Sequence, residues 1–105
     1  MNRKNNLDNI YGSQIMNVQD VVIGREKMLD FIIQQENIPD PHKTDARNML
    51  DRFVKQHRIV GKGTQTVAAA IAFYHIKKYR YESRTNFCGK YGATQQHVKE
   101  FISVT

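Results

Sequence analysis

The sequence contains a single cysteine, Cys88, and no long run of apolar residues. One cysteine cannot form a disulfide within the chain, and its isolation favours a reducing, intracellular setting. No stretch approaches the roughly 18 consecutive apolar residues that a membrane span needs. The opening stretch MNRKNNLDNIYGS has no apolar core of the kind found in secretory signals. We therefore expect an intracellular protein without a membrane partner.

Acidic residues are also scarce, because 10 Asp and Glu face 16 Lys and Arg, which gives a net charge of +6 and a pI of about 9.6. Only Glu82 and Glu100 oppose the basic residues of the last third. Those basic residues are Lys77, Lys78, Arg80, Arg84, Lys90 and Lys99. A concentration of positive charge in one part of a small domain favours a nucleic-acid partner, although the net charge alone is compatible with other acidic partners.

The residue patterns of common enzyme sites are missing. No serine lies in a nucleophile-elbow context, and Cys88 has no histidine near it in the sequence. The glycine-containing stretch IVGKGT lacks phosphate-loop spacing, because the positions for the first glycine and the final hydroxyl hold Gln56 and Gly63. The histidines are dispersed along the chain, at His42, His57, His75 and His97. We expect no catalytic activity, no cofactor and no metal site.

What the sequence does contain is a succession of apolar patterns with helical spacing. Residues 1–17 are polar and rich in Asn and are expected to form an N-terminal arm, with one all-α domain over residues 18–105. The first predicted helix runs from about Val18 to Gln35 and ends at ENIPDP, because proline disfavours helical geometry in the residue before it. Asp40 is a good N-cap and Pro41 a good first residue for the next helix.

The second and third predicted helices differ in their apolar patterns. The second has one amphipathic stripe, formed by Ala46, Met49, Leu50, Phe53, Val54 and His57. The glycines of IVGKGT end it, and Thr64 is a candidate cap for the third helix. From Val67 to Tyr74 the third helix is apolar on all sides and rich in alanine, which is typical of a helix surrounded by others. We expect this segment to be the most buried helix of the domain.

The stretch GKYGATQQHVKEF, residues 89–101, outlines two short helices joined through Gly92. The second of them places Val98, Phe101 and Ile102 on its inner face by spacing. Two helices joined in this way are typical of a helix-turn-helix, although other pairs of packed helices have the same outline. The expected DNA-contacting residues are Thr94, Gln95, Gln96, His97 and Lys99 on the second helix, together with Lys77, Lys78, Arg80, Arg84 and Lys90 around it.

Three features follow one another in a recognisable order. A helix ends at the pair Ile38-Pro39, an alanine-rich helix follows a glycine loop in GKGTQTVAAAIAFY, and the corner Gly92-Ala93-Thr94 precedes the last helix. In this order they resemble a single cyclin-like repeat of the general transcription factor TFIIB and its archaeal counterpart TFB, over residues 18–105. The chain has no zinc ribbon, because one cysteine cannot supply a four-ligand zinc site, and it contains no second repeat.

The resemblance implies a five-helix cyclin-like bundle with a C-terminal helix-turn-helix that contacts double-stranded DNA beside the TATA-binding protein. In that family the last helix reads a promoter element, and its contacting positions correspond to Gln96 and Lys99, where the family usually has an apolar residue and an arginine. A single repeat leads us to expect a homodimer. The abundance of Asn, Lys and Ile suggests an AT-rich genome, viral or archaeal. The alternative is a cyclin-like module that binds a protein partner through its second and third helices.

Overall fold

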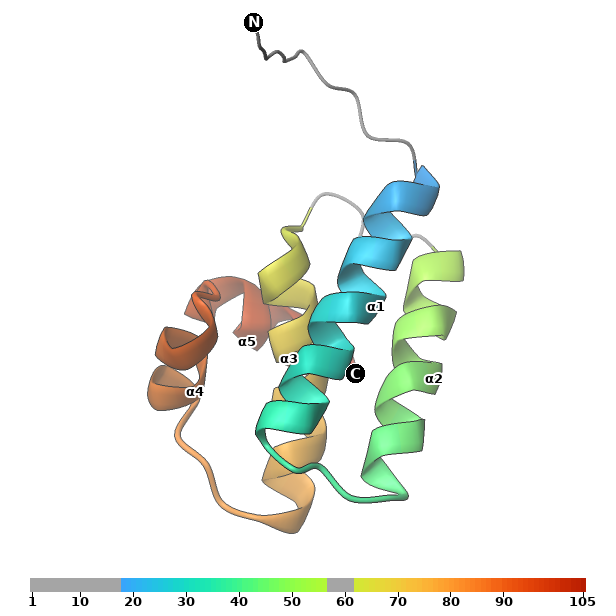
Figure 1. Ribbon diagram of the computed structural model, residues 1–105. Helices are drawn as coiled ribbons and strands as arrows, with labels where there is room; N and C mark the ends of the chain where they lie inside the picture. Colours follow the sequence, from blue (N-terminus) through green and yellow to red (C-terminus); the bar gives the residue numbers. More distant parts are fainter. Residues whose placement is uncertain (1–17, 57–61) are drawn as a thin grey trace, which may run out of the picture.

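The computed structural model describes residues 18–56 and 62–105, with the backbone alone for residues 18–22. The described residues form five helices and no strand (Figure 1): α1 (Val18–Gln35), α2 (His42–Lys55), α3 (Thr64–Tyr79), α4 (Arg84–Tyr91) and α5 (Gln95–Ser103). The predicted all-α class is confirmed, and α1 has the predicted bounds. The expected arm at residues 1–17 lies outside the described residues, as do His57 and Gly61. None of the described helices is long and apolar enough to cross a membrane.

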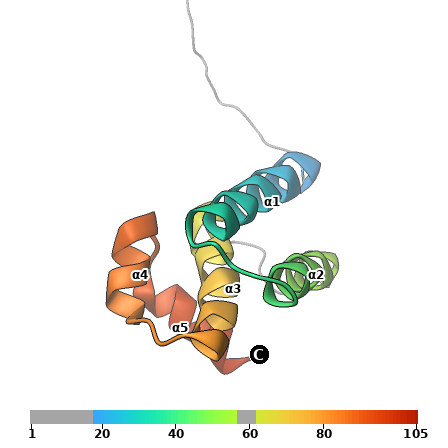
Figure 2. The same ribbon diagram turned by 60° about the horizontal axis from the view of Figure 1, so that its bottom comes forward.

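The central helix of the domain is α3. It contacts each of the other four described helices, and Figure 2 shows them arranged around it. Every residue from Val67 to Phe73 is at most 2 % exposed, and Tyr74 at the end of this segment is partly buried. The prediction that the Val67–Tyr74 segment is the most buried is therefore confirmed. Its alanines leave room for the neighbouring backbones to approach, so that several helices can share one modest core.

Aromatic pairs attach the two C-terminal helices to this core. The ring centroids of Phe73 in α3 and Phe87 in α4 are 5.5 Å apart, and those of Phe53 in α2 and Phe101 in α5 are 5.2 Å apart. Such pairs contribute about 0.5–1.5 kcal/mol each beyond the burial of their area. Because each pair joins two different helices, the rings fix the position of α4 and α5 relative to α2 and α3.

Two predicted helix starts are wrong by one residue. Pro41, not Asp40, is the N-cap of α2 and makes no side-chain hydrogen bond there. Asp40 still accepts hydrogen bonds from the backbone N–H (3.3 Å) and the hydroxyl (2.8 Å) of Thr44. Thr64 is the first residue of α3 instead of its cap, because the extended residue Gly63 (φ −65°, ψ 154°) precedes it. Residue preferences locate a helix end only to within one or two positions.

Candidate nucleic-acid interface

The segment in which the sequence suggests a helix-turn-helix forms α4, a three-residue turn and α5. Gly92 begins this turn in the left-handed conformation (φ 66°, ψ 31°). The backbone N–H of Ala93 donates to the carbonyl of Cys88 at 2.9 Å, which is the bond that closes a helix in a Schellman motif. A side chain at Gly92 would disfavour this conformation, so glycine sets the angle at which the chain leaves α4.

The helix α5 has one buried face and one exposed face. Val98 and Phe101 are at most 2 % exposed, and Ile102 packs against the core while partly buried. Gln95, Gln96 and Lys99 are exposed, and His97 is partly buried. The predicted inward side of α5 is therefore confirmed, and the residues between the inward positions form a polar outer face.

Thr94 is the N-cap of α5, and its side chain makes no capping hydrogen bond. Its backbone N–H instead donates to the hydroxyl of Thr66 in α3 at 3.4 Å. The start of α5 is thus attached to the N-terminal end of α3.

Neighbouring polar groups hold most of the outer face of α5. The hydroxyl of Thr85 donates to Oε1 of Gln95 at 3.2 Å, and Nε2 of Gln96 donates to Glu100 at 3.2 Å. Nζ of Lys62 lies 3.6 Å from the same Glu100 carboxylate. The hydrogen bond from Gln96 is the main cause that lowers the pKa of Glu100. These contacts order the side chains, and one acidic group lies among the residues expected to face DNA.

The structure separates the expected DNA-contacting residues into two regions. Thr94 meets Thr66 near the start of α3, whereas Lys77 and Lys78 lie in its last turn. Lys77 follows Thr66 by eleven positions in the same helix, which is roughly 16 Å along the axis. Lys78 instead lines a hollow together with Thr105, beyond the C-terminal end of α5. Lys77 and Lys78 are therefore not neighbours of the first turn of α5.

The remaining expected cations differ in their surroundings. Nζ of Lys78 lies 4.2 Å from the centroid of the Tyr74 ring, in a cation–π contact. Lys77 and Lys99 are exposed and have no ion pair among the residues that the structure describes. The Nε atom of Arg84 is buried without a hydrogen-bond partner in the described part of the chain. The last two expected cations, Arg80 and Lys90, are both ion-paired.

Arg80 and Lys90 converge on one carboxylate, that of Glu36, directly after α1. Nη2 of Arg80 donates to Oε1 of Glu36, while Nζ of Lys90 (2.8 Å) and the hydroxyl of Tyr91 donate to Oε2. Nε of Arg80 also lies 3.8 Å from Glu82. The Glu36 side chain is only 5 % exposed, whereas those of Arg80 and Lys90 are 39 % and 50 % exposed. We call Glu36, Arg80, Lys90 and Tyr91 the Glu36 cluster.

Burial and hydrogen bonds together set the protonation of Glu36 and Tyr91. Burial alone would raise the pKa of the Glu36 carboxyl, but the bonds from Lys90, Tyr91 and Arg80 outweigh it and lower the pKa below its usual value. Burial, aided by the bond to Glu36, raises the pKa of Tyr91. The carboxylate is therefore ionised and the phenol neutral at physiological pH.

Glu36 and Lys62 are two charged members of this region that sequence reasoning missed. Glu36 lies in ENIPDP, which marks the end of a helix, and its partners are 44 to 55 positions away. A charged residue in a helix-ending stretch carries no periodic signal that could point to partners so distant. Lys62 lies in a glycine loop, and only the packing of α5 brings it to Glu100.

Other groups in the described residues give no sign of a metal site. The rings of His42 and His75 approach to 6.0 Å between centroids, but within residues 18–56 and 62–105 no three His, Cys, Asp or Glu side chains are placed to hold an ion.

Comparison of the chain with protein-family models, with curated proteins and with solved structures finds no match. The residues of the site must therefore support any functional conclusion by themselves.

Proposed function

We propose that the protein is a DNA-binding domain that reads duplex DNA with the outer face of α5. The observation that carries this proposal is the exposed polar set Gln95, Gln96 and Lys99 on a helix whose opposite side is buried and whose start is fixed by Gly92. An α-helix with its side chains is roughly 10–12 Å across, so α5 fits a major groove about 12 Å wide.

The side chains of this face suit base recognition. The amide of a glutamine can pair with the N6 and N7 edge of adenine, and lysine suits guanine or phosphate. Nε2 of Gln96 has two N–H donors, of which Glu100 holds one and the other is available to adenine N7. Glu100 lies beside this contact, and its carboxylate can accept from the amino group of cytosine.

As the more specific role of this DNA-binding domain, we propose a transcription factor related to one repeat of TFIIB or TFB. It would act as a homodimer beside the TATA-binding protein. Only the order of the sequence features over residues 18–105 supports this part of the proposal. A homodimer would present two copies of α5 and so compensate for the few contacts that one short helix makes.

The test is the binding of the full chain to fluorescent DNA duplexes of varied sequence, with and without purified TATA-binding protein. Gln96→Ala should change the preferred sequence by about 1–3 kcal/mol at one base pair. Gln34→Ala is the matched control, because Gln34 is an exposed glutamine on α1, in a hollow that α1 shares with α2. Absence of binding at low salt, or equal effects of the two variants, would refute recognition by α5.

A hollow between α2 and α3 favours a protein-binding module as the second candidate function. It has a volume of about 370 Å³, and its lining includes Asn48, Arg52, Tyr74 and Lys78. In this case the unaltered chain would bind a protein partner and no duplex DNA, and Arg52→Ala would abolish the binding of that partner. If the first proposal holds, Arg52→Ala should keep the sequence preference of the unaltered chain.

A further inference from the structure

We propose, resting on the proposed DNA binding, that Glu36 is an internal competitor of DNA phosphate that withholds Arg80 and Lys90 from the nucleic acid. The domain would then bind DNA more weakly, and with less dependence on salt, than its net charge implies. This regulation by an internal contact is distinct from recognition by α5, because none of the three residues lies on that helix.

The Glu36 cluster has the composition of an anion site. A guanidinium, an ammonium and a phenolic hydroxyl converge on the two oxygens of one carboxylate. The same donors bind phosphate oxygens, since arginine and lysine form charge-assisted hydrogen bonds with either anion. Glu36 is thus an anion of the chain itself that already occupies the site.

Exposure decides which members of the cluster an incoming anion can meet. The side chains of Arg80 and Lys90 are 39 % and 50 % exposed, whereas that of Glu36 is 5 % exposed. A phosphate that approaches from solvent therefore reaches the two cations and not the carboxylate. Each cation has further N–H donors, but the nearby negative charge of Glu36 opposes a second anion.

The place of Lys90 in the fold makes this competition relevant to DNA. Lys90 lies in the last turn of α4, the helix that precedes the Gly92 turn. In helix-turn-helix proteins the first helix of the pair crosses the DNA backbone. Arg80 directly follows α3 and bonds the same carboxylate as Lys90, so a phosphate that meets Lys90 at the end of α4 would also lie close to Arg80.

The experiment measures the affinity of the full chain and of Glu36→Gln for one labelled duplex over a range of about 50–200 mM salt. Two released cations should steepen the slope of log affinity against log salt by up to about 1.8. The ratio of variant to unaltered affinity should then be roughly tenfold larger at the low end of this range than at the high end. An unchanged slope in a folded Glu36→Gln protein would overturn the proposal.

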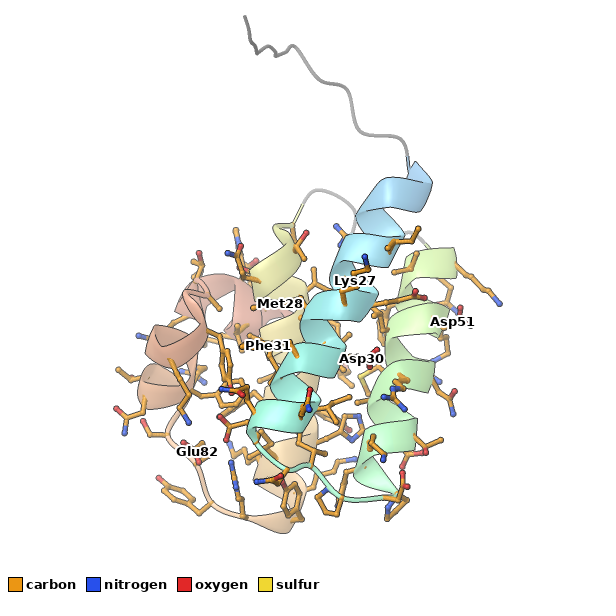
Figure 3. All side chains as sticks on the ribbon, in the orientation of Figure 1. Lys27, Met28, Asp30, Phe31, Asp51 and Glu82 are labelled. Atoms are coloured by element: carbon orange, nitrogen blue, oxygen red, sulfur yellow. The ribbon has the colours of Figure 1, made fainter. Side chains whose placement is uncertain are left out.

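Asp51→Asn is the matched control for the change in net charge. Asp51 pairs with Lys55 at 3.1 Å on α2, and Figure 3 shows it on the opposite side of α1 from α4 and α5. This variant removes the same charge from a different surface. If Asp51→Asn steepens the salt slope as much as Glu36→Gln does, net charge explains the effect and the proposal fails.

Lys90→Gln keeps the proposal testable if Glu36→Gln does not fold. In the unaltered chain Lys90 is held by Glu36, so Lys90→Gln should change the affinity by less than about twofold. Where Glu36→Gln does fold, the same change made in that variant should reduce the slope by about 0.9. A reduction of this size in the unaltered chain would mean that Lys90 already contacts phosphate, which overturns the inference.

The design separates the two proposals. If the unaltered chain binds duplex DNA but its salt slope is insensitive to Glu36→Gln, only the role of Glu36 is lost. If neither protein binds at any salt concentration, the proposed DNA-binding function and the inference fail together. Binding by Glu36→Gln alone would support both.

Discussion

Nζ of Lys90 lies 2.8 Å from Oε2 of Glu36, although 54 positions separate the two residues in the sequence. The contact joins the corner after α1 to the last turn of α4. Arg80 reaches the same carboxylate from the end of α3, so one buried anion connects three parts of the chain. The cluster therefore has a structural effect, which can be measured without any DNA.

Glu36→Gln should lower the free energy of unfolding by about 1–2 kcal/mol at neutral pH, because hydrogen bonds to a charged group are lost and the exposure of both cations weakens their pairing. The folded pKa of Glu36 is below its usual value of 4.5, so its contribution is present above that pH and disappears as the pH falls through the folded pKa. The gap between the two proteins should close in acid. Chemical denaturation at several pH values measures this difference in the free energy of unfolding. A difference that persists in acid would contradict the stabilising role of the ionised Glu36 carboxylate.

Gly92→Ala should destabilise the domain by about 1–2 kcal/mol, because Gly92 has φ +66° and an L-residue is strained there. A Cβ at this position would meet no atom within 4 Å, so the loss is conformational and not steric. Gly89→Ala is the matched control, since Gly89 lies within α4, where alanine should stabilise by roughly 0.5–1 kcal/mol. Thermal unfolding should move in opposite directions for the two variants. A shift of both in the same direction would contradict this account of the turn.

The parts of the fold that the sequence predicts are those in which apolar spacing alone decides the outcome. The all-round apolar character of Val67–Tyr74 has only one stable solution in a small domain, which is a central helix. Val98 and Phe101 likewise determine which side of α5 faces inward. These predictions need no knowledge of distant partners, because the pattern lies within one helix.

The arrangement of charges could not be predicted in the same way. Lys77 and Lys99 are both exposed lysines of the basic last third, yet Lys77 lies in the last turn of α3 and Lys99 lies on α5. A helix of 16 residues is roughly 24 Å long. Basic residues that belong to the same third of the sequence can therefore lie at opposite ends of the domain. The pairing of Arg80 with Glu36 is equally invisible, since it depends on how α1 packs against α3.

His75→Leu should stabilise the domain, by about 1 kcal/mol or more at neutral pH. The imidazole is 3 % exposed, and neither ring nitrogen has a hydrogen-bond partner among the described residues, so an apolar residue removes two unsatisfied groups. Burial, with the charges of Lys78 and His42, lowers the pKa of His75 to about 4, against the opposing effect of Asp45.

This low pKa adds a pH dependence with a defined sign. Between the unfolded value of 6.5 and the folded value of about 4 the unfolded chain binds more protons, so stability is lost as the pH falls through this window. The advantage of His75→Leu should therefore grow by about 1–2 kcal/mol from neutral pH to pH about 5. Chemical denaturation of the two proteins at both pH values measures this difference in the free energy of unfolding. A constant advantage, or an NMR titration of His75 near 6.5, would show that the imidazole is solvated instead.

The separation of the basic residues leads to a prediction about DNA affinity. Lys99 lies on the outer face of α5, whereas Lys77 lies in the last turn of α3, and both are exposed without an ion pair in the described residues. The two lysines are therefore matched in charge and exposure and differ in position. If α5 enters the groove, Lys99→Ala should weaken binding to all duplexes and reduce the salt slope by about 0.9, while Lys77→Ala should leave the slope within about 0.3. Fluorescence anisotropy over about 50–200 mM salt distinguishes these outcomes. Equal effects of the two variants would mean that overall charge drives binding, and the groove-facing role of α5 would then have to be abandoned.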